Sequence, residues 1–211
     1  MQKIVYKTLQ SPSKFEIPKI KGSRFFATIF PIDSKEQAET YLEEMRKTYY
    51  DATHNCYAWR CGVQANQDLF WNWILTSKLQ RSSDDWEPAN TAWKPILSVL
   101  IGEEIFDVLV VVTRYFWGTL LGVWGLIQAY TQATKEWIQN LDFVYRSLET
   151  ELDLDYSYDQ LSSAQYLFDK YECRILQEQY SEQVRQKVAV NIWYVESLKR
   201  EFVDRQLRFS C

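Results

Sequence analysis

The feature that most constrains the fold is a strict alternation of side-chain character between Leu148 and Tyr158. One set of alternate positions is apolar or aromatic apart from a threonine, and the intervening set is acidic: Glu149, Glu151, Asp153 and Asp155. Successive side chains of a strand point to opposite faces, so this period of two predicts a strand with one buried and one solvated face. Such a strand is typical of an antiparallel sheet that packs one face on a core.

The elements expected after this strand build a second domain over residues 141–211. A helix can begin with Ser157 and Gln160 as its cap, or with Asp159. Two strands follow, through 173–180 and 183–194, then a last helix, and a short strand near 207–209 can close the chain. The order βαββα predicts a ferredoxin-like sandwich.

Charge is unevenly divided between the two parts of the chain. Residues 1–140 are neutral overall, and the net charge of −4 lies in residues 141–211. This balance excludes a protein that coats nucleic acid by bulk attraction. Arg174, Arg185 and Lys187 are expected on the acidic side of the second sheet, where cross-strand pairs explain both sets of charges without a ligand. The first 24 residues carry six basic groups, which form either a local basic edge or a solvated strand face.

Residues 1–140 alternate strands and helices. Ser34 and Gln37 form a capping box that predicts a helix start. The apolar segment FDVLVVVTRYF, residues 106–116, predicts a central buried strand. The other expected elements are strands over 14–20, 24–31 and 56–63, a short helix over 94–100, and a long helix from about Val123 to Asn140.

No targeting, membrane or metal-binding signal stands out. The longest apolar run, Val108 to Val112, is too short to cross a bilayer, and the first residues lack the apolar block of a secretory signal. A cytoplasmic location without membrane contact is therefore expected. Four irregularly spaced cysteines and a single histidine predict reduced, mostly buried thiols, with no metal and no cofactor.

Three segments carry a resemblance to a known family. They read DATHNCYAWR from residue 51, SDDWEPANTAWKPIL from residue 83 and VVVTRYFWGTLLGVWGLIQAY from residue 110. Together with KGSRFFATIFPI from residue 21, they resemble the IMPACT family in its bacterial, YigZ-like branch. The resemblance covers residues 15–140, and the remainder of the chain fits the ferredoxin-like domain of bacterial members.

The resemblance implies both a fold and a role. The expected class is α+β with two domains: a ribosomal-protein-like left-handed βαβ fold over residues 1–140 and the ferredoxin-like domain over 141–211. The implied function is that of a translation-associated regulatory protein that contacts RNA, the ribosome or a translation factor, with no DNA expected. An enzymatic role is the less favoured interpretation, and the oligomeric state is left open.

Four tryptophans stand where the resemblance calls for glycine: Trp86, Trp93, Trp117 and Trp124. Glycine provides positive φ angles or close backbone approach in such loops, and tryptophan does neither cheaply. Our hypothesis is that the codons at these four positions are UGA, which the source lineage reads as glycine and which has been decoded here as tryptophan. Trp71 is a further candidate. The alternative is that the tryptophans are genuine and the loops are rebuilt.

The acidic loop and the single histidine are candidate catalytic residues. Asp84, Asp85 and Glu87 beside Thr91 could bind a cation or act as a general base, or could instead cap the helix that follows. His54, beside Asn55 and Cys56, could be half of a nucleophile pair, or could be structural. A hydrolase acting on a phosphorylated or peptide-like substrate would have to use His54 with one of the three carboxylates.

Arg114 and Tyr115 end the central strand just before a glycine-containing loop and helix. Backbone N–H groups there suit an anion such as phosphate, although Arg114 could equally pair with the acidic loop. A third option assigns partner binding to the acidic second domain. The leading hypothesis is one binding surface made of His54, Asn55, Asp84, Asp85, Glu87, Thr91, Arg114, Tyr115, Gly118, Gly122 and Gly125.

Overall fold

The structure is a computed structural model that describes residues 3–69, 72–139 and 141–210. Its internal contacts divide the chain into two compact units, one formed by Tyr6–Tyr145 and the other by Met1–Val5 with Arg146–Cys211. The expected α+β class with two domains is confirmed. The division lies a few residues beyond the predicted boundary at 140/141, and the first five residues join the second unit.

The first unit is built on a five-stranded antiparallel sheet with the strand order β2-β3-β6-β4-β5. The central strand, β6, is buried from Val108 to Arg114, as its apolar sequence predicts. The strands are β2 (Ser13–Glu16), β3 (Arg24–Pro31), β4 (His54–Gln67), β5 (Trp73–Ser83) and β6 (Val108–Tyr115).

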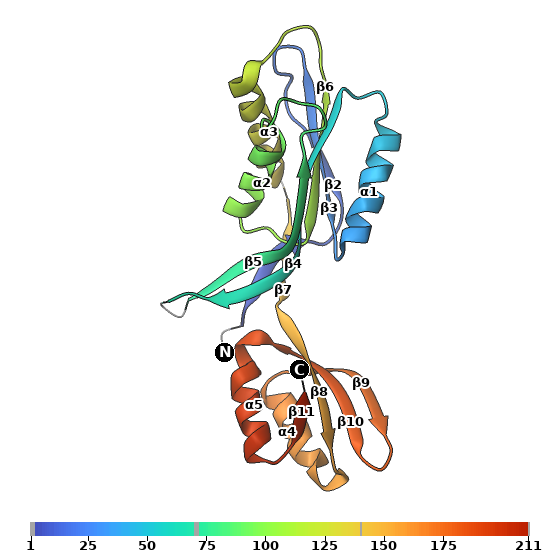
Figure 1. Ribbon diagram of the computed structural model, residues 1–211, viewed down its shortest axis with the longest axis vertical. Helices are drawn as coiled ribbons and strands as arrows, with labels where there is room; N and C mark the ends of the chain where they lie inside the picture. The colour runs from blue at the N-terminus through green and yellow to red at the C-terminus, as the bar shows by residue number, and fades with distance from the viewer. Residues whose placement is uncertain (1–2, 70–71, 140, 211) are drawn as a thin grey trace. The chain divides into compact units, whose positions relative to one another are not determined.

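Helices cover both faces of this sheet, which is why β6 can be apolar on both sides (Figure 1). Helix α1 (Lys35–Thr48) packs on one face. Helices α2 (Trp93–Gly102) and α3 (Gly122–Ile138) pack on the other. Ser34 accepts a hydrogen bond from the backbone N–H of Gln37 at 3.2 Å, so it is the predicted N-cap. The predicted capping box is only half formed, because Gln37 Oε1 accepts from the backbone N–H of Asp33 at 2.8 Å instead of that of Ser34. The end predicted for α3 at Asn140, and Trp71, lie outside the described residues.

A long hairpin was missed from sequence, where a polar stretch was expected. Strand β4 pairs with β6 only from His54 to Arg60, but with β5 as far as Gln67 opposite Trp73. The two strands therefore continue past the sheet as an arm (Figure 1). Residues on the arm have no core to pack against, so their sequence carries no buried apolar face to recognise.

A separate two-stranded sheet is formed by β1 (Val5–Leu9) and β7 (Phe143–Ser147). Neither strand was expected from the sequence. No helix among the described residues is long and apolar enough to span a membrane. The handedness of the crossover connections in the first unit stays a prediction.

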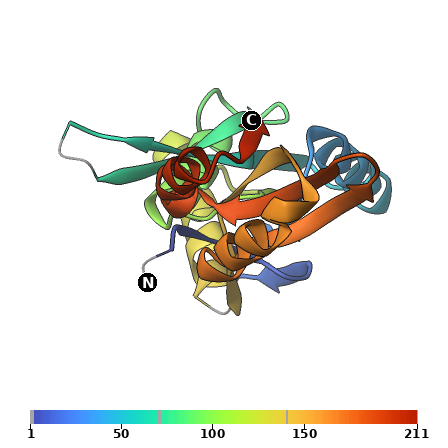
Figure 2. The ribbon, with the colours of Figure 1, turned by 90° about the horizontal axis from the view of Figure 1, so that it is seen from below.

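The second unit has the strand order β11-β8-β10-β9, the ferredoxin-like arrangement predicted from sequence. Helices α4 and α5 pack on one face of the sheet (Figure 2), where the apolar set of the alternating strand forms the core. Ser157 and Gln160 form the expected capping box. The elements are β8 (Glu149–Tyr156), η1 (Tyr158–Gln160), α4 (Leu161–Lys170), β9 (Arg174–Tyr180), β10 (Val184–Asn191), η2 (Ile192–Tyr194), α5 (Val195–Asp204) and β11 (Arg208–Ser210).

The other face of this sheet carries the predicted charge pairs. Arg174 Nη2 lies 2.7 Å from Glu149 Oε2, and Arg185 Nε lies 3.3 Å from Asp155 Oδ2. Lys187 Nζ lies 3.3 Å from Glu151 Oε2 and 3.8 Å from Asp153 Oδ1. The acidic and basic rows therefore pair across strands, as predicted: Arg185 and Lys187 reach the neighbouring strand β8, and Arg174 on β9 reaches β8 across β10.

Candidate binding site at the loop end of the first unit

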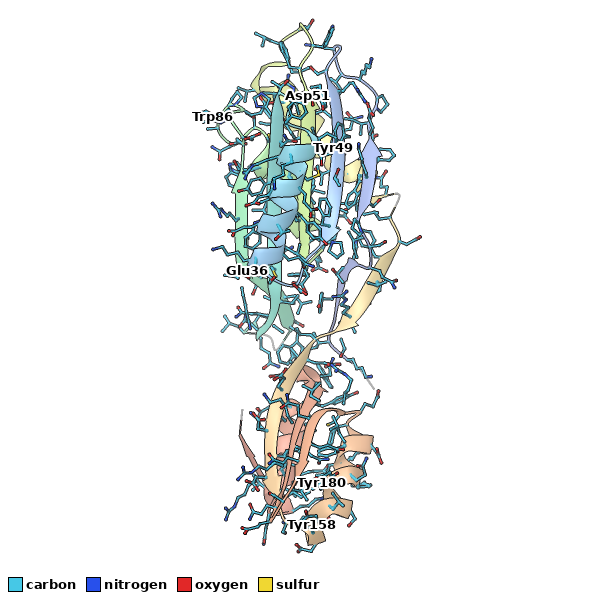
Figure 3. All side chains as sticks on the ribbon, turned by 90° about the vertical axis from the view of Figure 1, so that its right-hand side faces the viewer. Glu36, Tyr49, Asp51, Trp86, Tyr158 and Tyr180 are labelled. Carbon is cyan, nitrogen blue, oxygen red and sulfur yellow. The ribbon has the colours of Figure 1, made fainter. Side chains whose placement is uncertain are left out.

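The candidate residues gather around two loops, residues 84–92 and 116–121, which we call the loop end. The first loop joins β5 to α2, and the second joins β6 to α3. In Figure 3, Trp86 projects from the loop end, and Tyr49 and Asp51 lie toward the same end of the unit, opposite Glu36. The fold thus brings together segments that are far apart in sequence.

Asp84 organises the first loop. Its Oδ1 accepts hydrogen bonds from the backbone N–H groups of Ala92 at 2.9 Å and Trp93 at 3.0 Å, and its Oδ2 accepts one from Asn90 at 2.6 Å. Helix α2 thereby gains a carboxylate cap for its first free N–H groups. Thr91 Oγ1 donates to the carbonyl of Pro88 at 2.7 Å within the same loop.

Asp85 ties this loop to the first residues of β4. Its Oδ2 accepts a hydrogen bond from the backbone N–H of Asn55 at 2.6 Å. Its carbonyl oxygen lies 2.7 Å from Nδ1 of His54. Because a carbonyl oxygen can only accept, Nδ1 carries a proton, and Nε2 is the ring nitrogen that faces the interior.

Glu87 is the buried centre of the cluster. One carboxylate oxygen, Oε1, lies 2.5 Å from Nη1 of Arg114 and 2.9 Å from the hydroxyl of Tyr130, and both donate to it. Nε2 of His54 lies 3.6 Å from the same oxygen. Glu87 and Arg114 are only 7% and 4% exposed, so this is a buried ion pair rather than a surface one. The alternative that Arg114 pairs with the acidic loop is confirmed.

Cys56 is buried next to this pair, and its thiol is not activated as a nucleophile. Its Sγ is 2.9 Å from the carbonyl oxygen of Asp84 and 3.2 Å from the hydroxyl of Tyr130. Burial, followed by the nearby carboxylates, raises the pKa of the Cys56 thiol far above its usual range. Burial also raises the pKa of Tyr130 well above its usual range. A thiol held protonated in this way is a poor nucleophile.

The remaining predicted residues lie beside the cluster. Tyr115, half-buried, donates its hydroxyl to Asp51 at 2.8 Å. Gly118 and Gly122 have φ angles of +77° and +71°, values that favour glycine and let the chain turn sharply from β6 into α3. Gly125 lies within the first turn of α3. Sequence analysis missed Tyr130 as a member of the cluster, because an aromatic residue on the buried stripe of a helix normally indicates packing alone.

The outward surface of the loop end is exposed and apolar. Trp86 is 96% exposed, Trp117 is 77% exposed, and Leu120 also faces solvent. Trp124, in the adjoining first turn of α3, is 77% exposed as well. Trp86 adopts a φ of +69°, in the left-handed region that bulky side chains rarely occupy. By contrast, Trp59 and Trp137 are 2% and 1% exposed and belong to the core. The exposed tryptophans are therefore the ones that packing does not explain.

Comparison of the sequence with known proteins finds a family model and several relatives that have the same family name. The model of the Impact N-terminal domain matches residues 21–138. The chain is 31% identical over 188 residues to "IMPACT family member YigZ" of Escherichia coli (strain K12), covering 89% of this chain and 87% of that protein.

Solved structures are also similar. One, described as the crystal structure of a hypothetical protein, is 29% identical, covers 99% of this chain and 97% of its own, and has a TM-score of 0.68. A structure described as the two-domain translational regulator Yih1 is 25% identical and covers 61% of this chain and 44% of its own. Its TM-score of 0.34 is too low to support a structural argument.

Proposed function

The chain belongs to the IMPACT family, and we propose that it is a regulatory binding protein of translation that contacts RNA, the ribosome or a translation factor through the loop end of its first unit. A cytoplasmic location, without a bound cofactor, is part of the same proposal. The translation link rests on the family resemblance of the sequence motifs, and the choice of surface rests on the geometry of the loop end.

We favour binding over catalysis because the carboxylates of the cluster already form hydrogen bonds or an ion pair within the protein. Asp84 caps α2, Asp85 holds Asn55 and His54, and Glu87 pairs with Arg114. General acid–base chemistry needs a group that can reach a substrate and change protonation. Internally bonded groups instead hold the first loop against β4 and β6, and a rigid loop surface loses less entropy when it binds a partner.

Of the six basic groups in the first 24 residues, two lysines remain available for binding beside the loop end. Four of the six basic groups in the first 24 residues are engaged within the protein. Three have a carboxylate partner, in the pairs Lys3–Glu172, Lys7–Glu103 and Arg24–Glu16. The ammonium group of the fourth, Lys14, lies over the rings of Phe26 and Tyr49. The other two basic groups are Lys19 and Lys21.

Lys19 and Lys21 are exposed, and neither has an ion pair among the described residues. A Cβ added at Gly22 would lie 3.1 Å from the carbonyl oxygen of Trp117, so the turn that contains Lys21 touches the second loop. Unpaired lysines near the start of helix α3, which has no side-chain cap, suit phosphate groups of RNA. Exposed aromatic side chains would add base stacking.

The test is the binding of a fluorescently labelled single-stranded RNA oligonucleotide, followed by anisotropy at several salt concentrations, with sedimentation of ribosomes in parallel. The expected result is salt-sensitive association that the double variant Lys19→Glu, Lys21→Glu weakens about tenfold or more. Lys47→Glu, at an exposed lysine near the end of α1, is the matched control and should leave binding unchanged. An affinity that changes neither with the salt concentration nor in the double variant would contradict the proposal.

Arg114→Ala is a poorer variant for this purpose. Its guanidinium is buried against Glu87, so its removal would disturb the loops as well as any contact. Lys19 and Lys21 can be changed without touching the cluster, which makes loss of binding interpretable.

The hydrolase alternative has a separate test. His54, Asp85 and Glu87 do converge, which is the one observation in its favour. Turnover of a phosphorylated or peptide-like substrate that is lost in both His54→Ala and Asp85→Ala, with folding unchanged by circular dichroism, would replace the binding proposal. Protection of Cys56 from alkylation in the folded protein would add weight against a thiol mechanism.

A further inference from the structure

A groove lies between α2 and α3, the two helices on one face of the first unit's sheet. Its volume is about 810 Å³, and its walls come from both helices and from the loop that precedes α2. The apolar side chains that line it are Pro95, Val99, Val123, Trp124 and Ile127. Val123 and Trp124 are 56% and 77% exposed and Ile127 is half-buried, whereas Pro95 and Val99 are buried at the base of the groove. Exposed apolar side chains gathered along one groove often mark a binding surface.

The two charged residues at the rim that lack an ion pair among the described residues are both lysines. Lys94 lies in the first turn of α2 and Lys135 in the last turn of α3, and both line the groove. Neither lysine has an ion pair or a side-chain hydrogen bond within the described part of the chain. The acidic residue at the rim, Glu103, is already neutralised by Lys7, with 3.5 Å between Oε2 and Nζ. The groove therefore combines an apolar floor with an uncompensated positive rim.

We propose that this groove binds an acidic amphipathic helix of a partner protein. A helix laid into the channel between two others buries one apolar stripe against their side chains, as in other helix-in-groove complexes. Carboxylates flanking that stripe would meet Lys94 and Lys135, which guides the orientation of the helix and favours fast association. Helix α2 has 10 residues, about 15 Å at 1.5 Å per residue, so a partner helix of about three turns matches the groove.

Two other occupants fit the groove less well. A second copy of the chain would have to present a surface complementary to this one, and two positive rims facing each other repel. RNA would satisfy the lysines, but its sugar–phosphate backbone offers no apolar stripe for Val123 and Ile127. The inference goes beyond the proposed function, because it assigns an acidic helix of a partner protein to Lys94, Ile127 and Lys135, which lie outside the two loops of the loop end.

The experiment uses the full chain and a synthetic, fluorescently labelled peptide of about four helical turns, with Leu at the spacing of one helical face and Glu elsewhere. A peptide of the same composition with scrambled order is the first control. A peptide with Lys in place of Glu is the second. Affinities are measured by anisotropy, and the contact residues are mapped by amide chemical shifts.

The expected result is saturable binding of the acidic amphipathic peptide alone. The double variant Lys94→Glu, Lys135→Glu should weaken it about tenfold or more, while Lys47→Glu on the opposite helical layer should not. Ile127→Ser tests the apolar floor independently and should also weaken binding. Chemical-shift changes should fall on α2 and α3.

Several outcomes would overturn the inference. The scrambled peptide could bind as tightly as the amphipathic one, or the basic peptide could bind more tightly. The acidic peptide could also fail to bind at high micromolar concentration, or its affinity could be unchanged by all three groove substitutions. Concentration-dependent dimers lost in Ile127→Ser would assign the groove to a second copy instead. RNA binding lost with Lys94→Glu, Lys135→Glu but kept with Lys19→Glu, Lys21→Glu would assign the groove to RNA. The two sets of lysines thus allow this inference and the proposed function to fail separately.

Discussion

The loop end of the first unit and the polar sheet face of the second unit both concentrate charged side chains, but they do so in opposite surroundings. At the loop end, Glu87 and Arg114 form an ion pair whose side chains are 3% and 5% exposed. On the sheet face, the side chains of Arg174 and Glu149 are 64% and 32% exposed. The same chemical pairing is therefore buried in one place and hydrated in the other.

The difference in burial determines how much each ion pair can contribute to stability. A buried pair has lost its hydration, so each member depends on the other and on the surrounding hydrogen bonds. An exposed pair gains little from its partner, because water and salt replace it readily. We interpret the loop-end cluster as an arrangement that holds the first loop against β4 and β6, and the sheet-face pairs as a way to neutralise the solvated face of a sheet.

The largest expected effect is at the buried pair. Glu87→Ala should lower the free energy of unfolding by about 3–5 kcal/mol, because it leaves the Arg114 guanidinium buried without a counter-charge. Urea denaturation followed by circular dichroism measures the change. The double variant Glu87→Leu, Arg114→Met should lose less than Glu87→Ala alone. A loss below about 1 kcal/mol for Glu87→Ala would remove the contrast with the sheet face.

A smaller effect of opposite sign is expected at Trp86. Because its φ of +69° is costly for a bulky residue and its side chain is 96% exposed, Trp86→Gly should raise the free energy of unfolding by about 1 kcal/mol. Trp124→Gly, inside helix α3, is the matched control and should lower it by a similar amount. Destabilisation by Trp86→Gly would mean that the tryptophan packs in a way that its exposure does not suggest.

The same residue sharpens the hypothesis of UGA codons read as glycine. The protein purified from its native source should yield peptides in which residues 86, 93, 117 and 124 have the mass of glycine. Peptide mass spectrometry over these positions, together with the codons of the gene, decides the question. UGG at all four positions would end the hypothesis and make the exposed aromatic surface a genuine part of the loop end.

A weaker effect is expected on the polar sheet face. Arg174→Ala should change the free energy of unfolding by less than about 1 kcal/mol, and high salt should erase the difference from the wild type. A double-mutant cycle with Glu149→Ala isolates the pair. A coupling as large as that of Glu87 with Arg114 would show that hydration does not separate the two regions.

The smallest effect concerns acid pH in the second unit. Hydrogen bonds from Lys170 and then Tyr171 lower the pKa of Glu201. A carboxylate with a lowered pKa in the folded state stabilises the fold above its unfolded pKa, and this contribution is lost as the pH falls through the folded value. The difference in stability between the wild type and Glu201→Gln should therefore shrink as the pH falls below the usual range of glutamate. A difference that stays constant down to pH values below that range would contradict the assignment.

Much of the second unit could be predicted from sequence. Its alternation between Leu148 and Tyr158, its capping box and its two later strands are local patterns, and each leads to the element observed. In the first unit, the buried strand β6 and helix α1 were equally readable. The hairpin arm was not, because strands that pair away from a core need no alternating apolar face. Strand β1 was also missed, because its five residues end in two consecutive buried positions and show no alternation.

The candidate site was only partly readable. Asp84, Asp85 and Glu87 stand close in sequence, so their shared loop was visible, but their different roles were not. Tyr130 lies 43 residues from Glu87 in the chain and joins it only through the packing of α3 on the sheet. The groove between α2 and α3 likewise depends on how two helices pack side by side, which no local pattern encodes.

By itself, the sequence determined the α+β class, the ferredoxin-like second unit, the family and the acidic and basic rows that pair across strands, because each of these follows from local periodicity or from contiguous motifs. Only the tertiary structure decided that Glu87 and Arg114 are buried partners, that His54 and Cys56 are held in hydrogen bonds, and that Lys94 and Lys135 share one groove. Those properties depend on distances between segments remote in sequence and on the exclusion of water, which are set only when the first unit folds around its own core.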